Sequence, residues 1–514
     1  MYSMSAPRSL LATAVFAAVS GRVDPVGVAP LVRAAPTCDR APTGVEASDY
    51  NLDFVVPPHL MPDTRFDGRP ATIRVHRVAP AYAHGRCPGV QTTAMVLVHG
   101  RSIPGSATFD LRHPTTQDPG GGAISLQEAL ARSGIDTFAP DLLGYGKSTR
   151  FADGLDDPAN ASLPGFGADN SCATPEVGCG RTRNAGIFPL NQQARYLGDG
   201  KNPPVDGLGV NPLHGELRKH TSGHYFATAD VWARDILQVI DDAIAKARPR
   251  AGKVAVLGYS LGGARVARAL YRLGEHARRK VSRILLLASV FNRLPGVPGD
   301  VNLPTEEADL PDVEKSTSFP LAIGRTGGGD GVPPDRESVC TGRVPVGGPQ
   351  DLQRQVLDLD PLGKSWGGSD SAHPSGVFRL PTFTNYGWNP AVAATFTVPT
   401  LILQGSDDLA NPPANADNIF DSLTGVANTV MVKIECGGHF MHSEGCADAR
   451  CDDHNDATIP YGQTAQTWLG PHSTVAAALT EWVEHGTFDR EECGRFTFNA
   501  SGIAAQGATA GCPA

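Results

Sequence analysis

The pattern with the most definite chemistry in this sequence is a serine flanked by glycines. The stretch Gly258-Tyr259-Ser260-Leu261-Gly262 has the form G-x-S-x-G, which places a serine at a sharp turn between a strand and a helix. The glycines are needed because a Cβ at either position would clash in so tight a corner. A serine presented in this way becomes a nucleophile when a base removes its proton, so Ser260 is the candidate nucleophile.

A second match to the same pattern lies at residues 363–367, around Ser365. Chance matches are expected in a chain that has 58 glycines among 514 residues. The surroundings separate the two serines. Ser260 follows an apolar run and opens a stretch of small residues that permit close packing of a helix on a sheet, whereas Ser365 lies between Asp360-Pro361 and a glycine-rich loop. Only Ser260 meets the structural requirement of the pattern.

The base and the acid that a nucleophilic serine needs follow two later apolar runs. A histidine would accept the serine proton, and a carboxylate would orient the histidine ring and stabilise its charged form. The run 400–404 leads into Asp407 and Asp408, and the run 429–434 leads to His439. The spacing predicts His439 as the base and leaves both aspartates as candidates for the acid.

A site for acyl transfer must also stabilise a negatively charged oxygen. Backbone N–H groups serve this purpose, one on the residue after the nucleophile and one on a loop that follows an earlier strand. These rules predict the N–H groups of Leu261 and Arg101, the latter directly after His99-Gly100. Loss of one such donor typically costs about 3–4 kcal/mol of transition-state stabilisation.

Three other histidines, His442, His220 and His224, are interpreted as loop or pocket residues. A rival interpretation is a metal site built from Cys446, Cys451 and His454, with His442 nearby. Their spacing matches no common zinc pattern, so no metal is expected. The sequence offers no phosphate-binding loop and no dinucleotide fingerprint, so no cofactor is expected either.

The elements that would position these residues alternate along the chain after residue 90. Apolar β-type runs predict strands at 93–99, 135–140, 253–257, 282–289, 400–404 and 429–434. Helical spacing of apolar residues predicts helices at 124–132, 227–247, 261–273, 415–423 and 474–484, with 351–357 as a further candidate. Continuous apolar strands that alternate with helices predict a mostly parallel sheet with helices on both faces.

Together these features resemble the α/β-hydrolase-fold serine hydrolases, the superfamily of esterases, lipases and related peptidases. The resemblance rests on His99-Gly100, the segment 141–148 of the form D-x-x-G-x-G-x-S, the Ser260 turn, Gly405-x-x-Asp408 and His439, which span residues 93–485 in the family's order. The family's G-x-x-D habit implies Asp408 as the acid in preference to Asp407. The region between the 141–148 segment and the next helix is longer than the family usually shows.

Two polar stretches rich in glycine and proline interrupt the alternation, at about 150–225 and at 291–396. Loops of this length are usually functional or lid-like, so these insertions are expected to cover the edge where the strands end. The predicted division has five parts: a signal peptide and leader at 1–36, a first part of the core at 37–290, a cap at 291–396, a second part of the core with the acid and the base at 397–490, and a C-terminal tail at 491–514.

The N-terminus and the cysteines predict a secreted protein, extracellular or periplasmic. Arg8 precedes an apolar run at residues 10–19 with small residues after it, as in a secretory signal peptide. A stable membrane anchor takes about 20 apolar residues, and the run is shorter. All ten cysteines come later, and an even number after an export signal favours disulfides. The plausible local pairs are Cys172/Cys179 and Cys446/Cys451.

Composition and net charge indicate a globular protein and argue against a nucleic-acid-binding function. Hydrophobic residues make up 41% and charged residues 19%, as in a globular protein with a sizeable core. The net charge of −9 and the lack of long basic runs argue against a nucleic-acid partner. A serine at the turn, where dehalogenase and epoxide hydrolase relatives have aspartate, predicts acyl transfer to water.

The leading hypothesis is a secreted hydrolase of a small or polymeric carboxylic ester, with no stable membrane anchor. A serine peptidase or aminopeptidase with the same three residues is the first rival, because Glu306, Glu307 and Asp309 offer an acidic group to capture a free amine. An acyltransferase and a non-catalytic binding module on the same fold are weaker rivals. The preferred acyl chain, the leaving group and the oligomeric state stay open.

Overall fold

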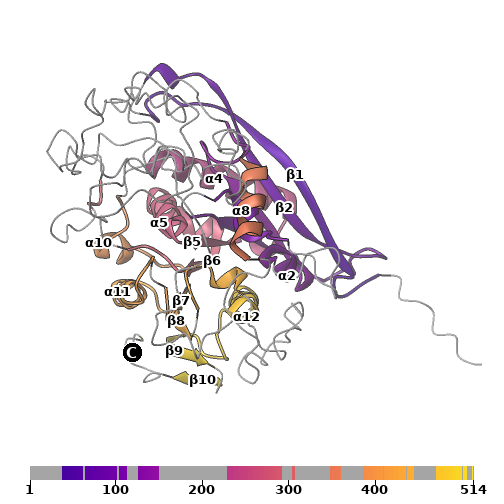
Figure 1. Cartoon of the computed structure of the whole chain (residues 1–514), viewed down its shortest axis with the longest axis vertical. Helices are drawn as coiled ribbons and strands as arrows, with labels where there is room; N and C mark the ends of the chain where they lie inside the picture. The colour runs from indigo at the N-terminus through magenta and orange to yellow at the C-terminus, as the bar shows by residue number, and fades with distance from the viewer. Residues whose placement is uncertain are drawn as a thin grey trace, which may run out of the picture. The chain divides into compact units, whose positions relative to one another are not determined.

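The strands form a single sheet in the order β1-β2-β4-β3-β5-β6-β7-β8-β9-β10. Figure 1 shows β1 and β2 at one edge and β9 and β10 at the other. The structure is a computed structural model. The residues that it describes, called the described residues below, are 38–61, 64–100, 103–112, 125–149, 229–291, 304–306, 309, 348–360, 386–408, 410–435, 437–444, 471–499, 502–505 and 512.

The central strands run parallel and the outer strands antiparallel. Strands β4, β3, β5, β6, β7, β8 and β9 run parallel to one another, whereas β1 and β2 at one edge and β10 at the other pair antiparallel with their neighbours. Their bounds are β1 Gly44–Val55, β2 Pro70–Ala81, β3 Thr93–Val98, β4 Ile135–Asp141, β5 Val254–Tyr259, β6 Val281–Leu287, β7 Thr400–Gly405, β8 Thr429–Ile434, β9 Gly494–Asn499 and β10 Gly502–Ala505.

Helices cover both faces of the sheet (Figure 1). One face carries α4 (Ala229–Ala247), α5 (Leu261–Leu273), α6 (Ala277–Lys280), α10 (Pro390–Ala393) and α11 (Ala414–Ser422). The other carries α1 (Gly105–Phe109), α2 (Leu126–Arg132) and α12 (Pro471–His485), while α8 (Gly348–Leu359) packs on α1. Short 3-10 segments lie at Thr64–Phe66, Arg250–Gly252, Gly274–His276 and Met441–Ser443.

In the parallel strands β3 to β8, alternate residues belong to two separate cores. In β5, Val254 and Val256 join the core that contains α4 and α5, whereas Ala255 and Leu257 join the core that contains α2 and α12. Successive side chains of a strand point to opposite faces, so a sheet buried on both sides needs continuous apolar runs. This is why the apolar runs of the sequence located the parallel strands β3 to β8, and the predicted fold class is confirmed.

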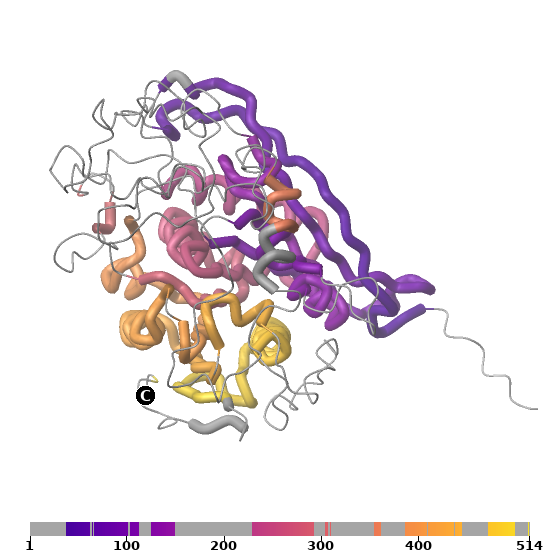
Figure 2. The backbone as a smooth tube through the Cα atoms, in the orientation of Figure 1, coloured from indigo at the N-terminus to yellow at the C-terminus, as the bar shows by residue number. Residues whose placement is uncertain are grey.

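The sheet also contains two strands that come before the alternation predicted after residue 90. Two long antiparallel strands, β1 and β2, precede that point and form one edge of the sheet (Figure 2). The apolar side chains of β1 alternate with polar ones, and β2 buries Arg74 and His76, both of which pair with Asp49 of β1. Buried charged residues that are paired across strands interrupt the apolar pattern by which the later strands were predicted.

The segment set apart as a C-terminal tail, residues 491–514, contains two strands of the sheet. Strand β9 pairs in parallel with β8, and β10 pairs with β9 at the edge. Phe496 and Phe498 of β9 are buried in the core that contains α12. The sheet therefore continues beyond residue 490.

Part of the second insertion belongs to the main core. Trp388, Val392 and Phe396 are buried in the core that contains α5, and the Trp388 ring stacks on Phe396 with centroids 5.4 Å apart. Most of the two insertions lies outside the described residues, and so do the predicted signal peptide and the residues Arg101, His220, His224, Glu307, Ser365, Cys446, Cys451 and His454. In the described part of the chain, no helix combines the length and the apolar character needed to cross a membrane.

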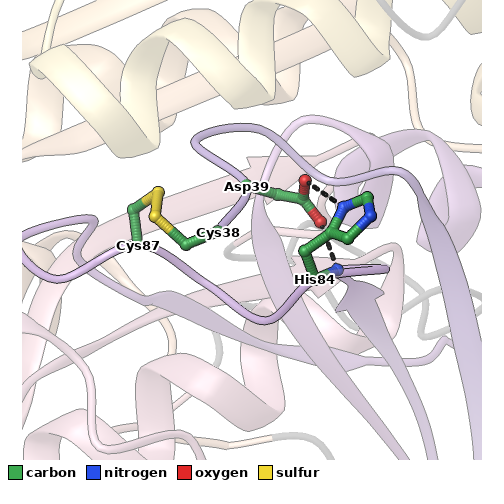
Figure 3. The surroundings of a disulfide bond; sticks show 4 residues. All are labelled: Cys38, Asp39, His84 and Cys87. Atoms are coloured by element: carbon green, nitrogen blue, oxygen red, sulfur yellow. Dashed lines mark hydrogen bonds and ion pairs between the residues drawn. A yellow bond between two sulfur atoms is a disulfide. The ribbon is translucent and has the colours of Figure 1, made fainter. Parts of the chain in front are cut away.

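The four cysteines among the described residues form two disulfides, Cys38–Cys87 and Cys493–Cys512. The first joins the segments on either side of the β1–β2 pair, where Asp39 also accepts hydrogen bonds from the backbone and the ring of His84 (Figure 3). The second joins the residue before β9 to the residues after β10. The expectation of disulfides is confirmed for these four cysteines, whereas the local pairs Cys172/Cys179 and Cys446/Cys451 lie outside the described residues.

Candidate active site

Ser260 occupies the corner between β5 and α5 in a backbone conformation that residues other than glycine rarely adopt. Its φ is 54° and its ψ is −121°. The corner is held on both sides, because its N–H donates to the Leu287 carbonyl at 2.9 Å and its carbonyl accepts from the N–H groups of Gly263 and Val290 at 3.1 and 3.2 Å. Strain that the surrounding structure maintains is a frequent feature of functional sites.

The glycines around Ser260 are required by close backbone approaches. A Cβ on Gly258 would lie 2.6 Å from the Gly262 carbonyl oxygen. A Cβ on Gly262 would lie 2.8 Å from the His99 carbonyl oxygen and closer still to that of Val98. Helix α5 therefore begins in direct contact with the carboxyl end of β3.

The structure brings Ser260, His439 and Asp408 together. His439 Nε2 lies 2.9 Å from Ser260 Oγ, and His439 Nδ1 lies 3.0 Å from Asp408 Oδ2 and 3.1 Å from Oδ1. All three residues are buried, with Ser260 6% and His439 9% exposed. Asp408 follows β7 and His439 follows β8, so the carboxyl ends of parallel strands bring the three side chains to one edge of the sheet.

The Asp408 carboxylate is fixed by donors that surround it. Oδ1 accepts from the backbone N–H groups of Ala410 and Asn411 at 2.9 and 2.8 Å, and Oδ2 accepts from Gln404 Nε2 at 3.1 Å. Together with the Nδ1–H of His439, these donors hold the Asp408 carboxylate in a single orientation. The geometry thereby sets the ring of His439 with Nε2 toward the serine.

Asp407, the alternative acid, connects the loop after β7 to the loop after β8. Its carboxylate accepts from Ser406 Oγ at 3.0 Å, and its N–H donates to the Gly437 carbonyl at 3.0 Å. The loops touch so closely that a Cβ on Gly405 would lie 2.5 Å from the Gly437 carbonyl carbon. The loop that carries the acid and the loop that carries the base are thus held against each other by backbone.

Of the two predicted oxyanion donors, Leu261 is among the described residues and Arg101 is not. Leu261 is the first residue of α5, so its N–H lies at the positive end of the helix dipole next to the serine. Arg101 lies outside the described residues, but the preceding Gly100 is in contact with the serine, since a Cβ on Gly100 would lie 2.8 Å from Ser260 Cβ. The loop after β3 therefore passes directly beside the nucleophile.

His442, the nearest alternative base, is part of the core. Its Nε2–H donates to the Thr108 carbonyl at 3.0 Å, and its ring meets that of Tyr259 edge to face with centroids 4.5 Å apart. Burial lowers the pKa of His442 to about 3, so the ring is neutral at physiological pH. Among the described residues, no group of three histidine, cysteine or acidic side chains is arranged to hold a metal ion.

The acidic group proposed for amine capture is already engaged in part. Glu306 accepts from Arg268 Nη2 at 3.0 Å, and Arg268 also donates to both carboxylate oxygens of Asp230. The Arg268 side chain is only 1% exposed, so the Glu306 charge faces a buried cation. Asp309 lies one turn further and donates its N–H to the Glu306 carbonyl.

Sequence reasoning missed the residues that support the site. Gln404 and Asn411 flank the acid, and Asn411 Nδ2 also donates to the Ala288 carbonyl at 2.6 Å. Arg265 lies on the buried face of α5 and reaches the loop after β3. The one available signal was Arg265 itself, a charged residue among the small and apolar residues that follow the nucleophile.

Comparison with known proteins identifies a family. The sequence model of the family described as alpha/beta hydrolase fold matches residues 94–445, a range that includes Ser260, Asp408 and His439. No curated protein sequence gives a significant match.

Solved structures give distant similarities. The thioesterase domain from the curacin biosynthetic pathway is 12% identical, with 85% of this chain and 99% of that chain covered and a TM-score of 0.36. The esterase from Exiguobacterium antarcticum is 15% identical (72% and 90% covered, TM-score 0.32), and the Paleococcus ferrophilus monoacylglycerol lipase is 14% identical (85% and 98% covered, TM-score 0.34). Identities and TM-scores this low do not indicate a function shared with these three proteins.

Proposed function

Because the chain belongs to the alpha/beta hydrolase fold family, we propose that it is a serine hydrolase that cleaves a carboxylic ester through an acyl-enzyme on Ser260. The observation that carries the proposal is the continuous hydrogen-bonded chain from Ser260 Oγ to His439 to Asp408. This arrangement of nucleophile, base and orienting acid performs acyl transfer on several unrelated folds.

In the first half of the reaction, His439 acts as the base. Its Nε2, 2.9 Å from Ser260 Oγ, takes the hydroxyl proton as the oxygen attacks the ester carbonyl carbon. The imidazolium that forms donates its Nδ1–H to Asp408, which remains ionised. His439 then gives the proton to the departing alkoxide, and the acyl group stays on Ser260.

Water completes the reaction by the same route in reverse order. His439 removes a proton from the water, the hydroxide adds to the acyl carbon, and the serine oxygen leaves with the proton returned by His439. In both halves the negative carbonyl oxygen needs donors beside Ser260. The N–H of Leu261 is the proposed first donor and that of Arg101 the second, each contributing about 3–4 kcal/mol of transition-state stabilisation.

An ester is a better-supported substrate class than a peptide with a free amine. Glu306, the described glutamate of the group considered for amine capture, is paired with the buried Arg268. An ammonium group would have to compete with Arg268 for this carboxylate, although Glu306 is half exposed and shares the arginine with Asp230. We therefore assign the site to small or polymeric carboxylic esters and keep peptidase activity as an outcome of the test.

Secretion belongs to the same proposal. Two disulfides among the described residues support an oxidising compartment, because disulfides form and persist mainly in exported proteins. The apolar run near the N-terminus would act as the export signal. An extracellular or periplasmic hydrolase would meet ester substrates from outside the cell.

The test compares hydrolysis of short-chain p-nitrophenyl esters with hydrolysis of amino-acyl anilides, with Ser260→Ala as the matched control. We expect ester turnover that falls by at least about 10³-fold in Ser260→Ala while the thermal unfolding curve is unchanged. Dominant anilide turnover would replace the ester assignment by a peptidase. Ester turnover that persists in Ser260→Ala would refute Ser260 as the nucleophile, and a folded protein inactive on both substrates would favour a binding module.

A further inference from the structure

A buried guanidinium connects the nucleophile helix to the loop beside the nucleophile. Arg265 lies in α5, five residues after Ser260, and is 0% exposed. Its Nη1 donates to the carbonyl oxygens of His99 and Gly100, both at 3.1 Å, and its Nη2 donates to the Tyr145 hydroxyl at 2.8 Å. One side chain therefore holds two consecutive carbonyls of the loop after β3.

The position is costly for a charged group. Removing a cation from water is unfavourable unless hydrogen bonds and charges replace the lost hydration. Burial lowers the pKa of Arg265, which reports that cost, and the guanidinium carbon lies 4.4 Å from the centroid of the Trp232 ring. Apart from Arg268, the other buried residues of α5 are small or apolar, so packing alone does not require an arginine here.

The Gly100 carbonyl receives a second donor from His99. The Nδ1 of His99 lies 2.8 Å from the Gly100 oxygen, and its Nε2 accepts the N–H of Leu142 at 3.1 Å. These contacts fix the neutral tautomer with the hydrogen on Nδ1. Burial, together with the nearby charge of Arg265, keeps the pKa of His99 well below its usual value of 6.5, consistent with a neutral ring.

The geometry points to a role in positioning an oxyanion donor. The carbonyl of Gly100 and the N–H of Arg101 belong to the same peptide unit, and in a planar trans peptide they point in opposite directions. We infer that Arg265, with His99, fixes the orientation of this peptide unit so that its N–H faces the oxyanion beside Ser260. Arg265 is then a positioning residue for the reaction, and this inference rests on the proposed function.

The two donors also polarise the peptide unit that they hold. Hydrogen bonds in a low-dielectric interior strengthen one another along a chain, so a carbonyl with two donors, one of them charged, makes its own N–H a stronger donor. Loss of the guanidinium would leave the neutral His99 ring as the remaining described donor to this carbonyl, so the orientation would loosen and the polarisation would weaken. Misplacement of a catalytic group by about 1 Å can cost about 10²-fold in rate, which sets the scale of the expected effect.

The experiment compares Arg265→Met with Arg265→Lys and with the control Arg268→Met. Arg268 lies one turn further along α5 and is equally buried, but its partners are Asp230, the Thr305 carbonyl and Glu306. The first readout is the second-order rate constant for inactivation by a fluorophosphonate. In that reaction Ser260 Oγ bonds to phosphorus, the P–F bond breaks, fluoride leaves, and the serine proton passes to His439.

The fluorophosphonate is chosen because its phosphoryl oxygen occupies the oxyanion position and its reaction needs no knowledge of the natural acyl chain. We expect Arg265→Met to lower the inactivation rate by about 10- to 100-fold, with Arg265→Lys in between and Arg268→Met within about threefold of wild type. On an ester substrate, kcat should fall by the same factor as the inactivation rate, with KM changed by less than about threefold.

The outcomes separate this inference from the proposed function. A wild type that is labelled but hydrolyses no ester, with slower labelling of Arg265→Met, would uphold the role of Arg265 and remove the ester assignment. Equal labelling of wild type and Arg265→Met, or equal losses in Arg265→Met and Arg268→Met, would overturn the role of Arg265 and leave the proposed function intact. A wild type that is not labelled at Ser260 would contradict both.

Discussion

Replacement of Asp408 by asparagine tests whether the site needs a carboxylate or only a hydrogen-bond acceptor next to His439. The structure dictates how the new amide must lie. Oδ1 accepts two backbone N–H groups, from Ala410 and Asn411, so the amide oxygen has to take that position. The amide NH₂ then takes the place of Oδ2. In the wild type, Oδ2 accepts hydrogen bonds from Gln404 Nε2 and His439 Nδ1, so the NH₂ group would face two donors.

That conflict forces a change of tautomer. Because an NH₂ group cannot accept the Nδ1–H of His439, the ring is stable only with Nδ1 bare and the hydrogen on Nε2. Nε2 then donates toward Ser260 Oγ, 2.9 Å away, and can no longer take the serine proton. An Asp→Asn change of this kind lowers kcat by about 10⁴-fold in a serine protease, which corresponds to about 5 kcal/mol of activation free energy.

The assay is steady-state hydrolysis of a p-nitrophenyl ester by the wild type, Asp408→Asn and the control Asp407→Asn. We expect kcat to fall by about 10³- to 10⁴-fold in Asp408→Asn with KM nearly unchanged, and by less than about tenfold in Asp407→Asn. The two side chains are adjacent and both buried, so a general loss of stability would affect both variants. A loss of less than tenfold in folded Asp408→Asn, or a larger loss in Asp407→Asn, would refute the assignment of the acid.

Two further predictions concern the backbone approach and the buried charges. Gly262→Ala should lower the free energy of unfolding by about 1–3 kcal/mol and kcat by at least about tenfold, because its Cβ would press on the carbonyls at the end of β3. The control is Gly44→Ala on β1, where a Cβ meets nothing within 4 Å, and an equal loss of stability in both variants would contradict the argument. His76 lies between Asp49 and Asp110, whose hydrogen bonds raise its pKa above 6.5 against the cost of burial. Its stabilisation is complete below pH 6.5 and is lost as the pH rises through the raised pKa, so urea unfolding should show His76→Gln less stable than wild type by about 1–3 kcal/mol at about pH 5.5 and by less at about pH 9. A deficit that grows with pH would reverse the sign and refute it.

The parallel part of the sheet could be predicted because its signal is local. Strands buried on both faces read as continuous apolar runs, and the predicted strand at 429–434 matches β8, Thr429–Ile434, at both ends. The helix predicted at 261–273 likewise matches α5, Leu261–Leu273. In both cases the residues that decide the structure lie within the element itself.

The antiparallel edge was not predicted because β1 and β2 lack continuous apolar runs, and the partners of their buried charges are distant in sequence. Arg74 of β2 is buried and donates to Asp49 at 2.6 Å, to Ser106 at 3.0 Å and to Asp141 at 3.4 Å. A strand that contains a buried arginine has a less apolar sequence than other buried strands, so its sequence does not reveal its burial. Only the fold supplies the partners that make the burial of Arg74 tolerable.

The site shows the same division. Ser260 and His439 follow from short motifs at the ends of apolar runs, and the structure places them 2.9 Å apart. The choice between Asp407 and Asp408 depends on the turn after β7, where backbone N–H groups fix the second carboxylate. Arg265 meets the loop after β3 only after the sheet has formed, more than 160 residues away in sequence, so no local motif marks it.

The central claim is that Ser260 forms a covalent acyl-enzyme, and a stopped-flow burst with peptide mapping tests it most directly. Rapid mixing with a p-nitrophenyl ester should release about one equivalent of p-nitrophenol per chain before steady state. Acid quenching at that point should leave the acyl mass on the peptide that contains Ser260, and Ser260→Ala should show neither burst nor adduct. An adduct on another residue, Ser365 included, or ester turnover by Ser260→Ala at the wild-type rate, would contradict the claim.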